Sequence, residues 1–136
     1  MGLEKQTPIY IFVQKIARWF IRPFCPFHAQ GMEQVPKEGA AIICCNHLGL
    51  TDVFRLGFSL KRQIYYMAKA ELFRVKPFAM ILKGLGAYPV QRGRSDRKAI
   101  NESARLIREG HLLGIFPEGH RSKDGLPGQP KAGAVM

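Results

Sequence analysis

Four short apolar stretches along the chain predict the strands of a sheet. Residues 40–45 are continuously apolar, which is typical of a strand covered on both faces. Three further stretches, at 64–68, 87–90 and 112–116, have the length and composition of strands. Each of these four stretches is therefore expected to form a strand, and a weaker strand is expected near residues 27–30.

Helices are predicted between these strands, at 51–60, 71–82 and 95–109. Pro77 should break the second of them. In the third, small and apolar residues recur on one face, Ser95 is a suitable N-cap, and Gly110 ends the helix. Strands that alternate with helices indicate an α/β fold with a mostly parallel central sheet flanked by helices.

The N-terminal segment, residues 8–22, has the pattern of a basic amphipathic helix. Its apolar stripe consists of Ile9, Phe12, Val13, Ile16 and Phe20, whereas its basic side consists of Lys15, Arg18 and Arg22. A boundary Trp19 suits a bilayer interface, although a helix packed on the protein's own core has the same pattern. The segment is too short to span a membrane, because about 22 Å of helix falls short of the hydrocarbon core. We expect a membrane-interface segment at 1–26 and an α/β domain at 27–136.

The net charge limits the possible partners to anionic molecules but does not distinguish among them. Lys and Arg number 21 against 10 Asp and Glu, which gives a formal net charge of +11. Such a surplus attracts anionic lipid headgroups, phosphorylated substrates, acidic proteins or nucleic acid. The three cysteines, including the adjacent Cys44 and Cys45, indicate small buried side chains in a reducing compartment rather than a disulfide framework. The histidines have no metal-ligand spacing, so no metal site is expected.

Polar residues that could take part in catalysis or binding follow three of the predicted strands. Residues 46–52 follow the first strand, Gln91 and Arg92 follow the third, and Pro117, Glu118 and Gly119 follow the fourth. Ligands of open α/β sheets bind at the carboxyl ends of the strands. A base, a guanidinium and a carboxylate are therefore expected to meet at one edge.

His47 and Asp52 form the candidate catalytic pair. With His47 at a strand end and Asp52 in the first turn of the next helix, the carboxylate can orient one imidazole nitrogen and leave the other free to take a proton. No G-x-S-x-G elbow or activated cysteine supplies a nucleophile. A base of this kind suggests that a substrate hydroxyl is deprotonated as it attacks a thioester.

The motifs resemble those of the glycerolipid acyltransferases, a family that includes the lysophosphatidic acid acyltransferases. Asn46-His47-x-x-x-x-Asp52 resembles the family signature, residues 86–93 its second block, and residues 116–122 its third. Residues 131–134 match a downstream Lys-x-Gly-Ala element, and residues 67–73 are also similar. The resemblance extends from about residue 27 to the end of the chain.

The resemblance implies a role for each matching residue. His47 and Asp52 would be catalytic, and the substrate-binding set would be Arg92, Glu118, Gly119, Arg121 and Lys131. In this scheme the guanidinium of the second block binds the acceptor phosphate. Structural alternatives remain for several members of the set: a solvated basic turn for Arg92, a turn cap for Glu118 and a solvated tail for Lys131.

Two departures from the family pattern stand out. His120 occupies a position where the family frequently has Thr or another small residue. In addition, the family would add a further strand, with a Pro-containing fourth block, after the point where this sequence stops. The sequence is therefore expected to be an acyltransferase domain that is incomplete at its C-terminus.

The function that the resemblance implies is transfer of a fatty acyl group to the free hydroxyl of lysophosphatidic acid, in phospholipid biosynthesis. The donor would be acyl-CoA or acyl carrier protein, with no other cofactor, and the protein would lie at the cytoplasmic face of an anionic membrane as a peripheral or monotopic protein. Glycerol 3-phosphate or another lyso-lipid is an alternative acceptor. A non-catalytic basic module that binds membrane or nucleic acid is the alternative from another class, although no nucleic-acid-binding signature is present.

Overall fold

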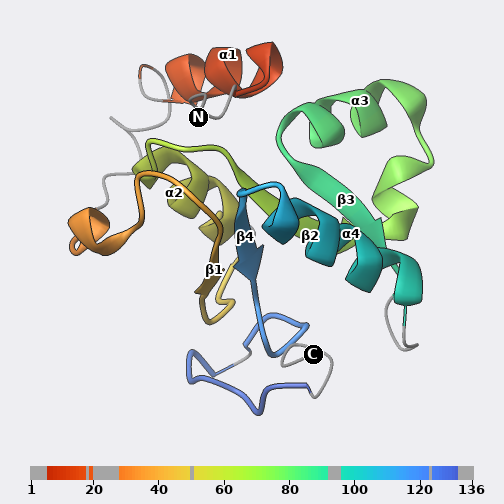
Figure 1. The fold of residues 1–136 in the computed structure, drawn as a ribbon. Coiled ribbons are helices and arrows are strands. Elements are labelled where there is room, and N and C mark those ends of the chain that lie inside the picture. The colour runs from red at the N-terminus through yellow and green to blue at the C-terminus, as the bar shows by residue number, and fades with distance from the viewer. Residues whose placement is uncertain are drawn as a thin grey trace.

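The computed structural model describes residues 6–17, 19, 28–49, 51–91, 96–122 and 124–131. Its centre is a four-stranded sheet, formed by β1 (Ala41–Cys44), β2 (Ile64–Lys69), β3 (Ala87–Val90) and β4 (Leu112–Ile115). The spatial order is β1-β4-β2-β3, and all three pairings are parallel (Figure 1). The α/β class and the parallel sheet predicted from the sequence are confirmed.

Three helices connect the strands, as the sequence pattern predicts, and a fourth precedes β1. They are α1 (Pro8–Ile16), α2 (Asp52–Ser59), α3 (Lys76–Gly84) and α4 (Arg97–Arg108), with short 3-10 turns η2 (Met32–Gln34) and η3 (Ala70–Phe73). The break predicted at Pro77 lies two residues earlier, because a proline in the first helical turn begins α3 rather than interrupting it. Asp96 caps α4 by accepting hydrogen bonds from the amides of Lys98 and Ala99. The predicted cap, Ser95, lies outside the described residues.

Each face of the sheet has its own hydrophobic cluster. On one face α4 packs over β3 and β4, and the cluster consists of Tyr88, Ala99, Leu106, Leu113 and Ile115. The opposite face carries Leu60, Ile64, Tyr66 and Leu112, with partly buried side chains of α2 and of β1 packed against them. The second cluster continues into Phe116, at the carboxyl end of β4, and therefore reaches the edge where the site was predicted.

The prediction that the first strand is covered on both faces is wrong. β1 is an edge strand, and α4 packs mainly on β3 and β4. The side chains of β1 that point to the α4 side are therefore open to solvent: Ile42 is 54% exposed, and Cys44 is exposed rather than buried. Burial of this strand depends on strand order, which the local sequence does not contain.

Helix α1 docks on the domain through polar side chains. The Tyr10 hydroxyl donates to the carbonyl oxygen of Gly57 at 2.9 Å, and the Gln14 amide donates to the same oxygen at 3.1 Å. The backbone amide of Thr7 donates to the buried Gln63 side chain at 2.8 Å. These partners lie in the last turns of α2 and just before β2, so α1 covers the amino-terminal end of the sheet.

The apolar stripe of α1 is only partly covered by the domain. Phe12 is 62% exposed and Ile16 is 40% exposed, whereas Ile9 packs against Gly84 of α3, and Phe20 lies outside the described residues. Phe12 and Ile16 therefore do not form part of the protein's own core. Among the described residues, no helix is both long and apolar enough to cross a bilayer.

A glycine on the central strand permits the packing of the second cluster. Gly114 is in register with Tyr66 on the neighbouring strand, and the tyrosine ring lies directly over it. A Cβ added at Gly114 would lie 2.6 Å from Cδ1 of Tyr66 and 3.1 Å from Cδ1 of Ile64. Both neighbours are fully or almost fully buried, so neither can move away without disturbing the core.

We predict that Gly114→Ala lowers the free energy of unfolding by about 1–3 kcal/mol, because the added methyl group overpacks this cluster. Urea denaturation of the variant would measure the loss. Gly57→Ala is a suitable control, since a Cβ there meets ordinary van der Waals distances inside α2 and should leave stability unchanged or improve it. Equal stability of Gly114→Ala and the unsubstituted protein would contradict the prediction.

Candidate active site

His47, Asp52 and the residues of the third block lie beyond the carboxyl ends of two adjacent strands, β1 and β4. His47 follows β1 and Glu118 follows β4, and pairing of these strands continues past β1 because the Cys45 amide donates to the Ile115 carbonyl at 3.0 Å. The loop after β4 then returns to the first motif, where the Ser122 amide donates to the His47 carbonyl at 2.7 Å. Figure 1 shows these two connections together at the lower end of the sheet.

His47 and Asp52 form the pair that the sequence predicts. Nδ1 of His47 lies 3.1 Å from Oδ2 of Asp52, and the two side chains are 13% and 20% exposed. The same carboxylate oxygen accepts the backbone amides of Leu48 at 2.7 Å and Gly49 at 2.6 Å. Asp52 is the first residue of α2, so one carboxylate joins the strand end, the connecting loop and the helix.

These contacts hold Asp52 in its charged form. Partial burial raises the pKa of Asp52, but hydrogen bonds from the Gly49 amide, His47 and the Leu48 amide outweigh it and hold the pKa below its usual value. An ionised carboxylate is an acceptor only, so the proton between the pair belongs on Nδ1 of the imidazole. Nε2 then carries the free lone pair and can take a proton from a substrate.

The imidazole ring of His47 also has an aromatic neighbour. The rings of His47 and Phe116 are stacked, with centroids 4.3 Å apart and an interplanar angle of 28°. The histidine is thus held at its Nδ1 atom, at its backbone carbonyl and on one ring face. Such a residue is prepared for proton transfer in one orientation.

Glu118 is a buried carboxylate, and only one of its two oxygens accepts a hydrogen bond from the described residues. It is only 4% exposed, and its Oε1 accepts the Gly128 amide at 3.0 Å. Its Oε2 is buried and has no hydrogen-bond partner among the residues that the structure describes. Buried polar atoms are normally paired, so this oxygen marks a place for a donor group from outside the described residues.

Gly119 and Lys131 lie against each other beside this carboxylate. Gly119 has φ +68°, a conformation that favours glycine, and a Cβ there would meet the Lys131 side chain at 3.2–3.4 Å. The Lys131 amide donates to the Pro117 carbonyl at 2.9 Å, which brings the distant end of the loop back to the third motif. Arg121 is exposed and lies next to Ser122, the residue that contacts His47.

Comparison with known proteins identifies the family. The family model described as "Acyltransferase" matches residues 26–136, which include every predicted site residue. The chain belongs to the acyltransferase family. No solved structure matches it.

Several relatives of this acyltransferase chain carry one name, 1-acyl-sn-glycerol-3-phosphate acyltransferase. The protein of that name from Bacillus subtilis is 40% identical over 104 residues, which are 76% of this chain and 51% of the relative. The chloroplastic protein from Arabidopsis thaliana is 30% identical over 127 residues, 90% of this chain and 35% of the relative. That from Borreliella burgdorferi is 31% identical over 107 residues, 77% of this chain and 43% of the relative. The chain thus spans about half or less of the length of these relatives.

The second block of the acyltransferase motifs comes from the far side of the sheet. Arg92 itself lies outside the described residues, but the preceding strand, β3, is separated from β1 by both β4 and β2. Three strand spacings correspond to roughly 14 Å between the ends of β1 and β3. The parallel sheet confirms that both strands end at the same edge, but it separates them across its full width.

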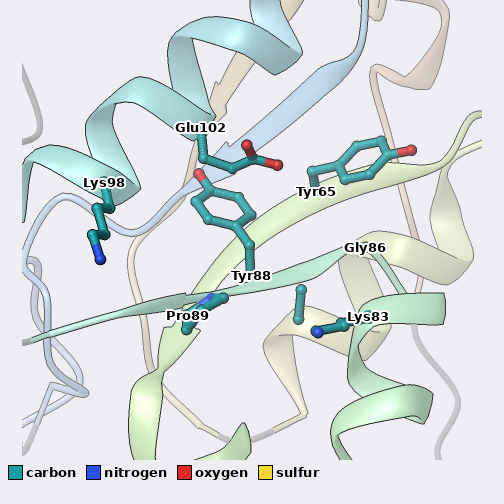
Figure 2. Close-up of a pocket in the computed structure, with 8 residues that line it drawn as sticks. Tyr65, Lys83, Gly86, Tyr88, Pro89, Lys98 and Glu102 are labelled. Atoms are coloured by element: carbon teal, nitrogen blue, oxygen red, sulfur yellow. The ribbon is translucent and has the colours of Figure 1, made fainter.

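A cavity of about 410 Å³ lies elsewhere in the acyltransferase domain. It is bounded by β3 and the helices beside it, with Tyr65, Tyr88, Lys83 and Lys98 among its lining residues (Figure 2). It contains none of the residues predicted for the site. Its acid, Glu102, already pairs with Arg105 on α4. The cavity therefore lacks the histidine–carboxylate pair found beyond β1.

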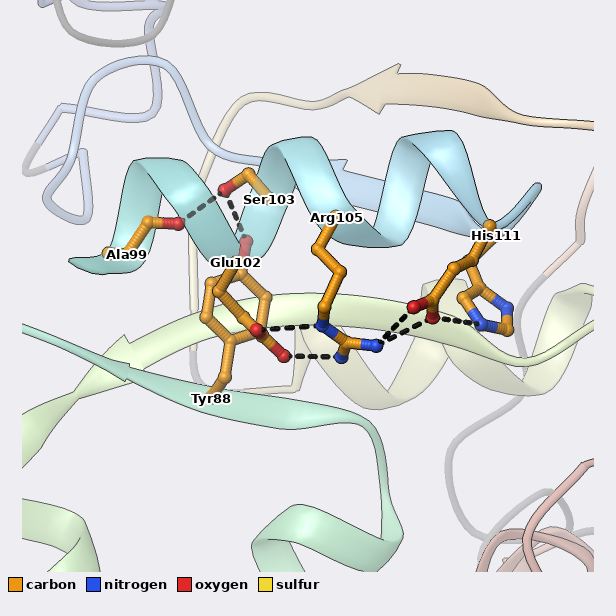
Figure 3. A network of polar contacts seen from close by, with 7 residues as sticks. Tyr88, Ala99, Glu102, Ser103, Arg105 and His111 are labelled. Atoms are coloured by element: carbon orange, nitrogen blue, oxygen red, sulfur yellow. Dashed lines mark hydrogen bonds and ion pairs between the residues drawn. The ribbon is translucent and has the colours of Figure 1, made fainter. Parts of the chain in front are cut away.

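A second group of charged residues, on the outer side of α4, is also unsuited to catalysis. Arg105 binds Glu102 at 2.6 Å and Glu109 at 2.6 Å, and His111 lies 3.5 Å from the latter (Figure 3). Both carboxylates are occupied by the guanidinium and are partly exposed. Such pairs on a helix surface contribute little to stability and leave no group free to act on a substrate.

Several contacts of the site are absent from the sequence prediction, among them the Phe116 ring on His47 and the Gly128 amide on Glu118. The first has a detectable signal, because alternation along β4 puts Phe116 on the same face as Leu112 and Gly114. The second has none, since it depends on how a ten-residue loop folds back.

We predict that Asp52 stabilises the fold in a pH-dependent manner. Because its pKa is lowered in the folded state, its contribution should be complete above the unfolded-state value of about 3.9 and lost as pH falls through the folded-state pKa. Asp52→Ala should therefore lower the free energy of unfolding by about 1–2 kcal/mol at pH 7 and by progressively less below pH 4. Urea unfolding at several pH values would test this, and a deficit that is independent of pH would contradict it.

Proposed function

We propose that the protein is a 1-acylglycerol-3-phosphate O-acyltransferase, which transfers a fatty acyl group to the free hydroxyl of lysophosphatidic acid. The observation that carries this proposal is the 3.1 Å contact between His47 and Asp52 beside the buried Glu118, in a chain of the acyltransferase family. The shared name of the relatives supports the choice of acceptor. Acyl-CoA or acyl carrier protein is the proposed donor.

In the proposed reaction, His47 is the general base. Its Nε2 takes the proton of the acceptor hydroxyl while the hydroxyl oxygen attacks the thioester carbonyl. The tetrahedral intermediate then collapses, the carbon–sulfur bond breaks, and the imidazolium returns its proton to the departing thiolate. Asp52 stabilises the imidazolium that forms between the two steps. General-base assistance of this kind contributes roughly 10²–10⁴-fold to the rate.

Acceptor binding is assigned to the residues around Glu118. The unpartnered Oε2 of Glu118 can accept a hydrogen bond from a glycerol hydroxyl, which would satisfy its buried oxygen. Lys131, Arg121 and Arg92 supply positive charge for the acceptor phosphate. The Lys131 side chain lies against Gly119. The net charge of +11 suits the anionic acceptor, the anionic donor and the membrane that holds the acceptor.

We also propose that α1 lies on the cytoplasmic surface of an anionic membrane. The helix uses polar atoms to dock on the domain and leaves Phe12 and Ile16 exposed, so its apolar side is available to lipid. The neighbouring α3 also exposes large apolar side chains, including Phe78, Met80 and Ile81. Exposed apolar area of this extent marks an interaction surface on a protein this basic.

We predict that His47→Ala lowers kcat for acyl transfer by roughly 10²–10⁴-fold, since the base is lost. Thiol release from acyl-CoA or acyl carrier protein, measured on the full-length protein with lysophosphatidic acid, glycerol 3-phosphate and other lyso-lipids, would test both the base and the acceptor. His111→Ala is the matched control, because His111 also pairs with a carboxylate but lies outside the site. Near-normal turnover by His47→Ala would remove the base from the mechanism, and a preference for glycerol 3-phosphate would replace the acceptor.

We predict that Phe12→Gln combined with Ile16→Gln weakens binding to vesicles of anionic phospholipid at least about tenfold. Transfer of these two apolar side chains from water into lipid should contribute more than about 1.4 kcal/mol to the binding free energy. Co-sedimentation with vesicles would measure it. Ile42→Gln is the control, since Ile42 is similarly exposed but lies on the edge strand rather than on α1. Unchanged binding of the double variant would show that α1 is not the lipid contact.

A further inference from the structure

We propose that Phe116 is a positioning residue for the reaction, and that its ring fixes the plane of the His47 imidazole so that Nε2 points at the acceptor hydroxyl. The inference rests on the proposed role of His47 as general base. It is carried by the stacked rings, whose centroids are 4.3 Å apart.

The hydrogen bond to Asp52 does not fix the imidazole by itself. The second side-chain torsion of histidine has broad minima, so a ring held at Nδ1 alone can still tilt about that contact. The Ser122 amide anchors the backbone carbonyl of His47 but does not touch its ring. Contact with a flat ring at an interplanar angle of 28° supplies the missing restraint on the plane.

Phe116 is itself held in place from the core. Its ring stacks on that of Tyr66, with centroids 6.2 Å apart and an interplanar angle of 16°. Tyr66 is buried over Gly114, and its hydroxyl donates to the Val53 carbonyl in α2 at 3.3 Å. Three rings therefore run from the rigid centre of the sheet to the base, and the last is only as mobile as the core behind it.

The ring also suits the charge that develops during the reaction. When His47 accepts the hydroxyl proton it becomes a cation, and the electron-rich face of an aromatic ring attracts a cation that lies over it. Phe116 therefore assists Asp52 in stabilising the imidazolium, from the ring face rather than from the ring edge. An aliphatic side chain of similar volume would fill the space but would provide neither the flat surface nor this attraction.

The kinetic test compares Phe116→Leu with Phe116→Tyr in the full-length protein. The leucine variant should lose roughly 10–100-fold in kcat, as expected when a reacting group is misplaced, with little change in the KM for the acceptor. The tyrosine variant keeps the ring and should stay within about threefold of the unsubstituted enzyme. Leu106→Val, which removes apolar volume from the cluster under α4, should leave kcat unchanged.

A spectroscopic test reports on the stack without relying on turnover. The ring current of Phe116 should displace the NMR signals of the His47 ring protons, and Phe116→Leu should return them to ordinary positions while Phe116→Tyr does not. Equal kcat for the leucine and tyrosine variants, or His47 signals that do not move in Phe116→Leu, would overturn the inference. Retained activity of His47→Ala would instead overturn the general-base mechanism, so the two failures are distinguishable.

Discussion

The close approach of Tyr66 to Gly114 is the constraint on which the rest of the structure depends. Two parallel strands in register bring their residues opposite each other, and only a glycine at one position lets a phenol ring lie flat across its neighbour. That ring then supports Phe116 and contacts the Val53 carbonyl of α2. One missing side chain in the centre of the sheet thus fixes the packing of a helix and the surroundings of His47, the proposed base.

The carboxylate of Asp52 serves both the fold and the proposed site. Its Oδ2 atom accepts the imidazole and two consecutive backbone amides, so the connection between β1 and α2 is closed by the same oxygen that orients His47. The amides favour an ionised carboxylate, and an ionised carboxylate favours the imidazole tautomer that leaves Nε2 free. The contacts that close the connection between β1 and α2 therefore also orient the imidazole of His47. For this reason the two residues can be separated by a short loop rather than sharing a helix.

How much the sequence predicts depends on whether a feature is local. Strand positions and the His47–Asp52 pair were predictable because apolar runs end in polar residues where a parallel sheet collects its ligands. Exposure of Ile42 and Cys44 was not, because it follows from strand order, with β1 at the edge of the sheet while α4 packs mainly on β3 and β4. The hydrogen bond from Gly128 to Glu118 was not predictable either, since it depends on the path of a loop.

The orientation of α1 relates the proposed membrane surface to the proposed base, His47. The carbonyl of Gly57, near the end of α2, binds α1, whereas Asp52, at the start of α2, binds His47. Gly57 lies five residues after Asp52, so at about 1.5 Å per residue α2 separates the two contacts by roughly 8 Å. If α1 lies in the headgroup layer as proposed, with its apolar side about 5–10 Å deep, the base is held outside the hydrocarbon. That is the level at which the hydroxyl of a glycerol phosphate lipid meets water, and it is where a water-soluble thioester donor can reach it.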